Sequence, residues 1–129
     1  MKKYYYIILG FLILSFGCSK TISNESGAII FTTDAAVSNI NVASNFPVVI
    51  KITSAISPNG GLKVELTAVE EVSGLSVLPQ SPLFTTTTAN NGTSIINLPQ
   101  QKWVVATVKI TDINKATNTA SKSFRVIYK

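Results

Sequence analysis

Histidine is absent from the 129-residue chain, and cysteine occurs once, as Cys18. The missing histidine excludes Ser-His-Asp and Cys-His nucleophilic systems and histidine-based zinc sites. One cysteine cannot form an internal disulfide, so the chain must fold without that crosslink. Only 13% of the residues are charged, and beyond the first twenty residues the basic ones are spread singly. Nucleic-acid binding needs a basic cluster, so we expect no nucleic-acid partner.

The acidic residues do not form a pattern typical of an active site. A glycosidase needs two carboxylates that face each other across a cleft. Glu70 and Glu71 are adjacent, so on a strand their side chains point to opposite faces. Gly60 and Gly61 follow an asparagine in a turn rather than linking a strand to a helix, so they form no phosphate loop. We therefore expect a protein that is not an enzyme and has no catalytic residue.

The N-terminal residues have the layout of an export signal. Two lysines near the start precede an apolar run over residues 7–16, and Gly17 stands directly before Cys18. The apolar run is too short to span a bilayer, for which a helix needs about 20 apolar residues. A basic start, a short apolar run and a small residue at the end are typical of a signal peptide. The sequence predicts a helical signal peptide over residues 1–17.

The segment Leu-Ser-Phe-Gly-Cys at residues 14–18 resembles the lipobox of bacterial lipoproteins, in the relaxed form of Bacteroidetes-type bacteria. The resemblance implies cleavage between Gly17 and Cys18, a diacylglycerol on the Cys18 sulfur, and a lipidated tether over residues 18–27. No other cofactor is expected. The acidic stretch that resembles a surface-export signal is missing after Cys18. The resemblance therefore implies an outer-membrane anchor in the cell envelope, with the periplasmic face favoured over the cell surface.

From residue 28 onward, short β-type runs alternate with turn signals, which is typical of a sandwich. Apolar and polar residues alternate over 62–68 and 103–111, which places one face of each strand in a core. Further strands are expected at 28–33, 38–43, 46–53, 72–78, 83–88, 94–98 and 121–128. Residues 57–61 predict a hairpin turn, and residues 90–92 predict another turn.

The last two runs carry a more specific resemblance. Residues 103–112 read Trp-Val-Val-Ala-Thr-Val-Lys-Ile-Thr-Asp, and after a polar loop residues 120–128 read Ala-Ser-Lys-Ser-Phe-Arg-Val-Ile-Tyr. This pair resembles the closing hairpin of bacterial immunoglobulin-like domains. The resemblance implies an all-β, antiparallel immunoglobulin-like β-sandwich of about seven strands over residues 28–129. It implies a fold and no particular activity.

Two candidate binding sites follow from the loops and the aromatic residues. Asp112, Asn114 and Asn118 share one loop, and Asp34 from another loop could join them as oxygen ligands of calcium. Asp112 can equally cap a turn at the end of its strand. Trp103 lies on the face opposite to the apolar residues of its strand. It could stack there on a sugar ring, or it could cover the end of the core.

These features favour a membrane-anchored lipoprotein of the cell envelope, with a non-catalytic domain for binding or structure. Its partners would be the membrane, through the lipid, and an envelope protein or a glycan. Two alternatives stay open. A carbohydrate-binding accessory lipoprotein would use Trp103. A surface-filament subunit would accept a strand at an unpaired edge near residues 83–88.

Replacing Cys18 by serine removes the only sulfur that can carry the lipid. We expect Cys18→Ser to abolish labelling by radioactive palmitate in the native bacterium and to release the protein from membranes. The neighbouring Ser19→Ala variant is the control and should keep its label. Undiminished palmitate labelling of Cys18→Ser would refute the lipid anchor.

Overall fold

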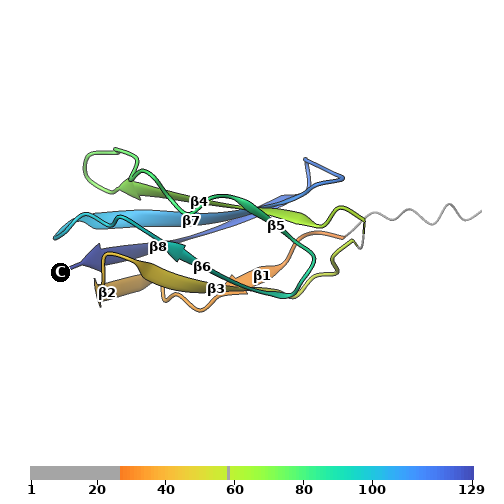
Figure 1. Cartoon of the computed structure of the whole chain (residues 1–129), viewed down its shortest axis with the longest axis horizontal. Helices are drawn as coiled ribbons and strands as arrows, with labels where there is room; N and C mark the ends of the chain where they lie inside the picture. Colours follow the sequence, from red (N-terminus) through yellow and green to blue (C-terminus); the bar gives the residue numbers. More distant parts are fainter. Residues whose placement is uncertain (1–26, 58) are drawn as a thin grey trace, which may run out of the picture.

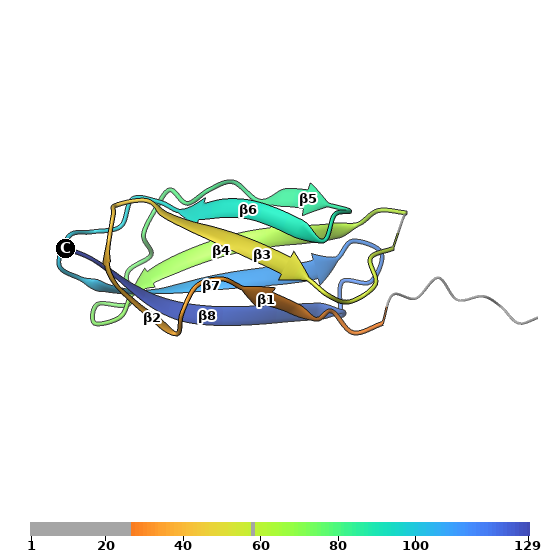
Figure 2. The ribbon, with the colours of Figure 1, turned by 90° about the horizontal axis from the view of Figure 1, so that it is seen from below.

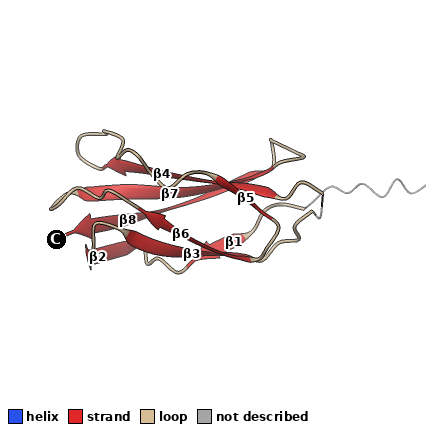
Figure 3. Ribbon diagram, viewed as in Figure 1, coloured by secondary structure: helices blue, strands red, loops and turns tan. Residues whose placement is uncertain are grey.

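The computed structural model describes residues 27–57 and 59–129, so the expected signal peptide, Gly17 and Cys18 lie outside the described residues. The described residues contain strands and loops but no helix, and thus no helix that could cross a membrane (Figure 3). The strands are β1 (Phe31–Thr33), β2 (Ser38–Val42), β3 (Phe46–Ile52), β4 (Leu62–Glu70), β5 (Phe84–Thr86), β6 (Asn90–Ile95), β7 (Trp103–Asp112) and β8 (Thr119–Tyr128).

The eight strands form two sheets that pack face to face (Figure 1). The smaller sheet has the order β1-β3-β6, and the larger sheet has the order β2-β8-β7-β4-β5. Strands β3 and β6 on one side, and β4, β7 and β8 on the other, take the positions of strands B, E, C, F and G of immunoglobulin domains. β5 pairs with the outer edge of β4, as strand C′ does in variable-type domains. The prediction of an all-β immunoglobulin-like sandwich is confirmed.

The core lies between the sheets and follows the alternation of the long strands. On β7, the residues Val104, Ala106, Val108 and Ile110 are all fully buried. β4 alternates in the same way, and its buried positions begin at Leu62. β4 and β8 flank β7 along its whole length as antiparallel partners. The predicted inward faces of these strands are therefore confirmed, and the three strands form the centre of the larger sheet.

The sandwich differs from the expected all-antiparallel pairing at its N-terminal strands. β1 pairs antiparallel with β3 in the smaller sheet, whereas β2 pairs parallel with β8 in the larger sheet. The segment between them crosses from one sheet to the other. Asn39 fixes this crossing, because its side-chain amide donates hydrogen bonds to the carbonyl oxygens of Ala36 at 2.8 Å and Arg125 at 3.0 Å. The crossing divides the N-terminal region into two short strands.

The hairpin expected at residues 57–61 is wrong, because this turn joins β3 to β4, which belong to different sheets. Its glycines still have a conformational role. Gly61 has a φ of +73°, and a Cβ atom there would lie 2.5 Å from the carbonyl oxygen of Thr86. Only glycine fits that backbone and that close approach. The turn residues therefore indicate a sharp reversal but do not identify the sheet that the next strand joins.

Two further expectations for the middle of the chain are wrong. Residues 72–78 do not form a strand; the turn after β4 is closed by a hydrogen bond from the Gly74 amide to the Glu70 carbonyl at 2.9 Å. Residues 90–92 are not a turn but the start of β6, where Asn91 pairs with Ile50. The Asn91 side chain accepts a hydrogen bond from the Thr86 hydroxyl at 2.6 Å, so the reversal falls before β6.

The two ends of the sandwich carry different parts of the chain (Figure 2). At the proximal end, the described chain starts at Gly27, whose carbonyl accepts a hydrogen bond from the Asn118 side chain at 3.1 Å. β7 extends for ten residues from Trp103 to Asp112, which is about 30 Å at the usual rise of a strand. The distal end therefore contains Trp103, the turn after β4 and the C-terminal strand end at Tyr128.

Two neighbouring valines on β3 test the position of the core. Val48 is fully buried, whereas Val49 is 46% exposed. We expect Val48→Ala to lower the free energy of unfolding by about 2 kcal/mol, because it removes buried methyl groups and leaves a cavity. The matched control Val49→Ala should cost about 0.5 kcal/mol or less. Chemical denaturation measures both variants, and equal losses would contradict the described packing of β3.

Candidate functional site

A pocket of about 390 Å³ opens at the distal end of the sandwich. We call it the distal pocket; its lining residues are Glu70, Val72, Ser73, Gln101, Lys102 and Trp103. Two segments that lie some thirty residues apart contribute to it, namely the turn after β4 and the segment before β7. They meet because β4 and β7 pair antiparallel, with Glu70 opposite Val104.

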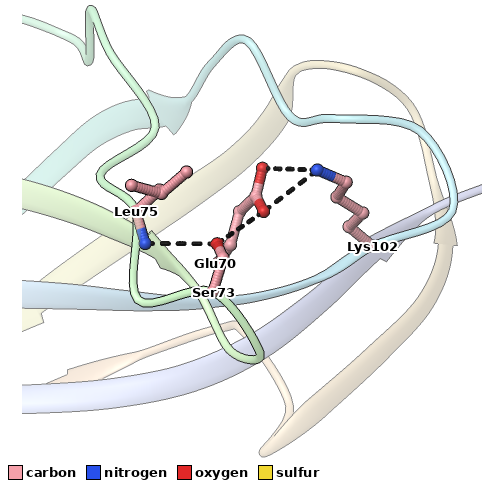
Figure 4. Close-up of polar contacts among 4 residues, drawn as sticks. All are labelled: Glu70, Ser73, Leu75 and Lys102. Atoms are coloured by element: carbon pink, nitrogen blue, oxygen red, sulfur yellow. Dashed lines mark hydrogen bonds and ion pairs between the residues drawn. The ribbon is translucent and has the colours of Figure 1, made fainter.

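An ion pair supported by a hydroxyl lies at the base of this site (Figure 4). The Lys102 ammonium is 3.0 Å from both carboxylate oxygens of Glu70, and the Ser73 hydroxyl donates to one of them at 2.7 Å. The Ser73 oxygen in turn accepts the backbone N–H of Leu75 at 3.2 Å. The Ser73 hydrogen bond first, and Lys102 second, hold the pKa of the Glu70 carboxyl below its ordinary value of 4.5. Glu70 is therefore ionised at neutral pH, and the pair carries no net charge.

The indole of Trp103 is held in place by a second charged pair. The guanidinium carbon of Arg125 lies 4.2 Å from the centre of the Trp103 ring, a cation–π contact. Arg125 also binds the Glu71 carboxylate at 2.6 Å, and the Glu71 backbone N–H donates to the Trp103 carbonyl at 2.9 Å. Neither Arg125 nor Glu71 lines the distal pocket. Trp103 thus contributes both to the lining of the distal pocket and to a contact with Arg125 that lies outside this lining.

Gln101 enters the pocket from a backbone conformation that is uncommon outside glycine. Its φ is +60°, and its backbone N–H donates to the carbonyl of Tyr128 at 2.6 Å. This hydrogen bond ties the segment before β7 to the last residue of β8. Both walls of the pocket are thus fixed by main-chain contacts, one at Gly74 and the other at Gln101.

The candidate calcium ligands have other roles in the structure. Asp112 is 2% exposed, and its carboxylate accepts the Asn114 backbone N–H at 2.9 Å and the Asn118 side-chain amide at 3.5 Å. The Asn114 side-chain amide donates to the Asn59 carbonyl. Asp112 therefore closes the turn between β7 and β8, which is the capping role that the sequence also allowed.

Asp34 is not brought to that turn. Its carboxylate accepts the backbone N–H of Val49 at 2.8 Å, in the middle of β3 and in the other sheet. Within residues 27–57 and 59–129, no group of three or more histidine, cysteine, aspartate or glutamate side chains is placed to hold a metal ion. The structure therefore does not assemble the calcium site that Asp34, Asp112 and Asn114 suggested.

A second hollow of about 410 Å³ lies between the β1–β2 crossing and β8. Its walls include Thr32, Val37 and Ser123, and its one charged lining residue is Lys122. The Lys122 ammonium lies 5.8 Å from the centre of the Phe31 ring. The one aromatic residue in its lining, Phe124, is only 4% exposed, and no ion pair lies among its lining residues, so the distal pocket is the stronger candidate site.

The sequence identified one residue of the distal pocket and missed the others. Trp103 was expected on the outward face of its strand, and it does lie outside the buried core. Glu70 and Glu71 were expected to point to opposite faces, and they bind different partners, Lys102 and Arg125. The sequence signal for the pocket is the pair Glu70-Glu71 at the end of one strand, together with Lys102-Trp103 at the start of its partner strand. That signal becomes readable only when the register of the two strands is known.

No protein-family model matches the chain, and no curated protein sequence matches it. The class that the structure defines is an immunoglobulin-like β-sandwich domain with a small pocket at its distal end. The residues that line this pocket determine which ligands it can bind.

Removing the Ser73 hydroxyl should change the titration of Glu70. We expect Ser73→Ala to raise the pKa of the Glu70 carboxyl toward 4.5, and Lys102→Met to raise it as well, because it removes both a hydrogen bond and a positive charge. The folded-state pKa is below the unfolded one, so the stabilisation by ionised Glu70 is present above about pH 4.5. It is lost as the pH falls through the lowered pKa.

Carbon-13 NMR of the side-chain carboxyl group measures this titration. Ser121→Ala, on β8, is the control and should leave the pKa of Glu70 unchanged. A pKa of Glu70 that does not move in Ser73→Ala would contradict the hydrogen bond described for this pair.

Proposed function

We propose that this protein is a lipid-anchored lipoprotein of the cell envelope, with an immunoglobulin-like sandwich that serves as a non-catalytic binding module. The distal pocket is its binding site. The observation that carries the proposal is the placement of this pocket at the end of the domain opposite to Gly27, where the described chain begins. An anchor at the N-terminus leaves that end of the domain free to meet a partner.

The anchor itself rests on the sequence. Gly17-Cys18 follows a short apolar run with a basic start, and only eight residues lie between Cys18 and Gly27. A tether of that length reaches at most about 30 Å when fully extended. The domain would thus be kept close to the membrane, with the outer membrane and its periplasmic face as the proposed location.

Exposed apolar side chains around the distal pocket support a binding role. Val72 is 97% exposed, Leu75 is 65% exposed and Leu78 is 75% exposed, and all three belong to the segment that follows β4. Several exposed large apolar side chains on one short segment favour an interaction surface. At the proximal end, Ile113 is 46% exposed. A partner that docks at the distal end would bury apolar surface that the folded domain alone leaves in water.

The charges of the pocket favour binding over catalysis. A general acid near neutral pH needs a carboxyl group with a raised pKa. The pKa of Glu70 is lowered instead, because Ser73 and Lys102 stabilise its ionised form. Glu70 is therefore suited to accepting hydrogen bonds from a ligand and unsuited to act as a general acid near neutral pH.

The filament alternative has less support. β5 is an edge strand of the larger sheet, as that alternative requires. A donor strand would normally complete an unfinished core, but Val48, Ile50 and Val104 are fully buried by the domain's own strands. A neighbour could add to the edge of β5 without filling any gap in the core.

Site-specific photo-crosslinking in the native bacterium tests the proposed binding surface. A photoreactive amino acid in place of Val72 should give a discrete adduct with an envelope protein or glycan, because this side chain stands at the rim of the pocket. The same amino acid in place of Ile113 is the control at the proximal end and should give none. Equal adducts from both positions, or none from Val72, would count against a binding role of the distal end.

A further inference from the structure

The charge of the distal pocket limits the ligands that it can bind. Glu70 and Lys102 neutralise each other, with 3.0 Å between the ammonium and the carboxylate oxygens. No unpaired cation among the lining residues is left to recognise a phosphate or a carboxylate. The uncharged polar groups are the Ser73 hydroxyl and the Gln101 amide. The pocket therefore matches a neutral ligand.

The remaining walls require a ligand with an apolar face. Trp103 and Val72 both line the distal pocket and are the apolar residues in its lining. A pyranose ring presents C–H groups on one face and hydroxyl groups around its edge. Its face packs on an aromatic ring, and its hydroxyls both donate and accept hydrogen bonds. A sugar ring thus offers both kinds of contact that the pocket presents.

The polar groups of the pocket suit hydroxyls in particular. The Glu70 carboxylate accepts hydrogen bonds, the Lys102 ammonium donates them, and the Gln101 amide does both. Lys102 keeps donor capacity for a ligand, because its side chain is 57% exposed, whereas that of Glu70 is 16% exposed. Two hydroxyls on adjacent ring carbons could bind one charge each without separating the pair. The pocket volume of about 390 Å³ is at the lower end of small-ligand sites and fits a short saccharide.

The indole is fixed before any ligand arrives. Arg125 packs on the Trp103 ring at 4.2 Å and is itself held by Glu71 at 2.6 Å. A platform that is already ordered loses little side-chain entropy on binding, so more of the contact energy appears as affinity. Arg125 does not itself line the pocket, so a ligand there would not have to displace its contact with Trp103.

We propose that the distal pocket binds a neutral saccharide, with Trp103 as the stacking platform and Glu70, Lys102 and Gln101 as hydrogen-bond partners of its hydroxyls. The inference rests on the proposed function, because it takes the distal pocket to be the binding site of the anchored module. It specifies the chemical class of the ligand. An apolar peptide is the competing occupant: it would use Val72 and Leu75 and would not need the charged pair.

Trp103 is the only tryptophan of the chain, so its fluorescence reports on this pocket alone. The test uses the full-length protein in a detergent without a sugar headgroup, titrated to millimolar concentration with cellotriose, maltotriose, mannotriose and chitotriose. We expect a saturable change in the Trp103 emission with at least one trisaccharide and none with inorganic phosphate. A flat response to all four trisaccharides, or a response to phosphate of the same size, would overturn the proposal.

Two variants locate the binding at the pocket. Gln101→Asn keeps a residue type that tolerates the left-handed backbone, but its shorter side chain moves the amide away from the pocket. Lys102→Met removes the ammonium group and keeps an apolar side chain of similar length. Each should weaken trisaccharide binding about tenfold, the effect of one lost hydrogen bond of about 1.4 kcal/mol. Lys63→Met is the matched control, since Lys63 lies 3.5 Å from Glu65 on β4 in a comparable exposed pair, and it should bind as the parent does.

Equal binding by Lys102→Met and Lys63→Met would place the sugar elsewhere and overturn the proposal. Unchanged or stronger binding of an apolar peptide by Lys102→Met, with no trisaccharide binding by the parent, would identify the competing occupant. The lipid anchor does not enter these titrations, so a failure of palmitate labelling and a failure of sugar binding can be told apart.

Discussion

The register of β4 against β7 is the constraint on which the rest of the structure depends. It places Leu62 opposite Asp112 and Glu70 opposite Val104, so the apolar residues of both strands face the smaller sheet together. A slip of one residue would turn the Lys63 face of β4 into the core and expose its apolar face. The same slip would separate the turn after β4 from the segment before β7, and the distal pocket would not form.

Both ends of the sandwich use carboxylates, but in different ways. At the proximal end, the buried Asp112 carboxylate is engaged by N–H groups of its own turn, which closes that end with local contacts. At the distal end, Glu70 and Glu71 bind the side chains of Lys102 and Arg125, which come from other parts of the chain. In the turn at the proximal end, the hydrogen bonds of the Asp112 carboxylate are made within the turn itself. Side-chain pairs at a strand end leave donors and an aromatic surface next to water.

The long strands could be predicted from the sequence because apolar and polar residues alternate along each of them, and this alternation identifies the buried face. Trp103 to Asp112 alternates so regularly that the strand and its inward face follow from period two alone. The turn predicted at residues 90–92 is wrong, because an Asn-Asn-Gly run favours a turn in isolation, whereas here its pairing with β3 keeps it extended. The parallel partner of β2 and the partners of Trp103 could not be predicted. Both depend on contacts between segments far apart in the chain, which no local pattern encodes.

The division of the first strand between the two sheets also fixes where the chain leaves the domain. β1 and β2 run in the same direction along the sandwich, and every later segment reverses the one before it (Figure 2). The chain therefore travels the length of the domain an odd number of times between Gly27 and Tyr128. An odd number of passes places Gly27 and Tyr128 at opposite ends of the domain. One strand more or fewer would bring the C-terminus back beside Gly27, whereas this count leaves it next to the distal pocket.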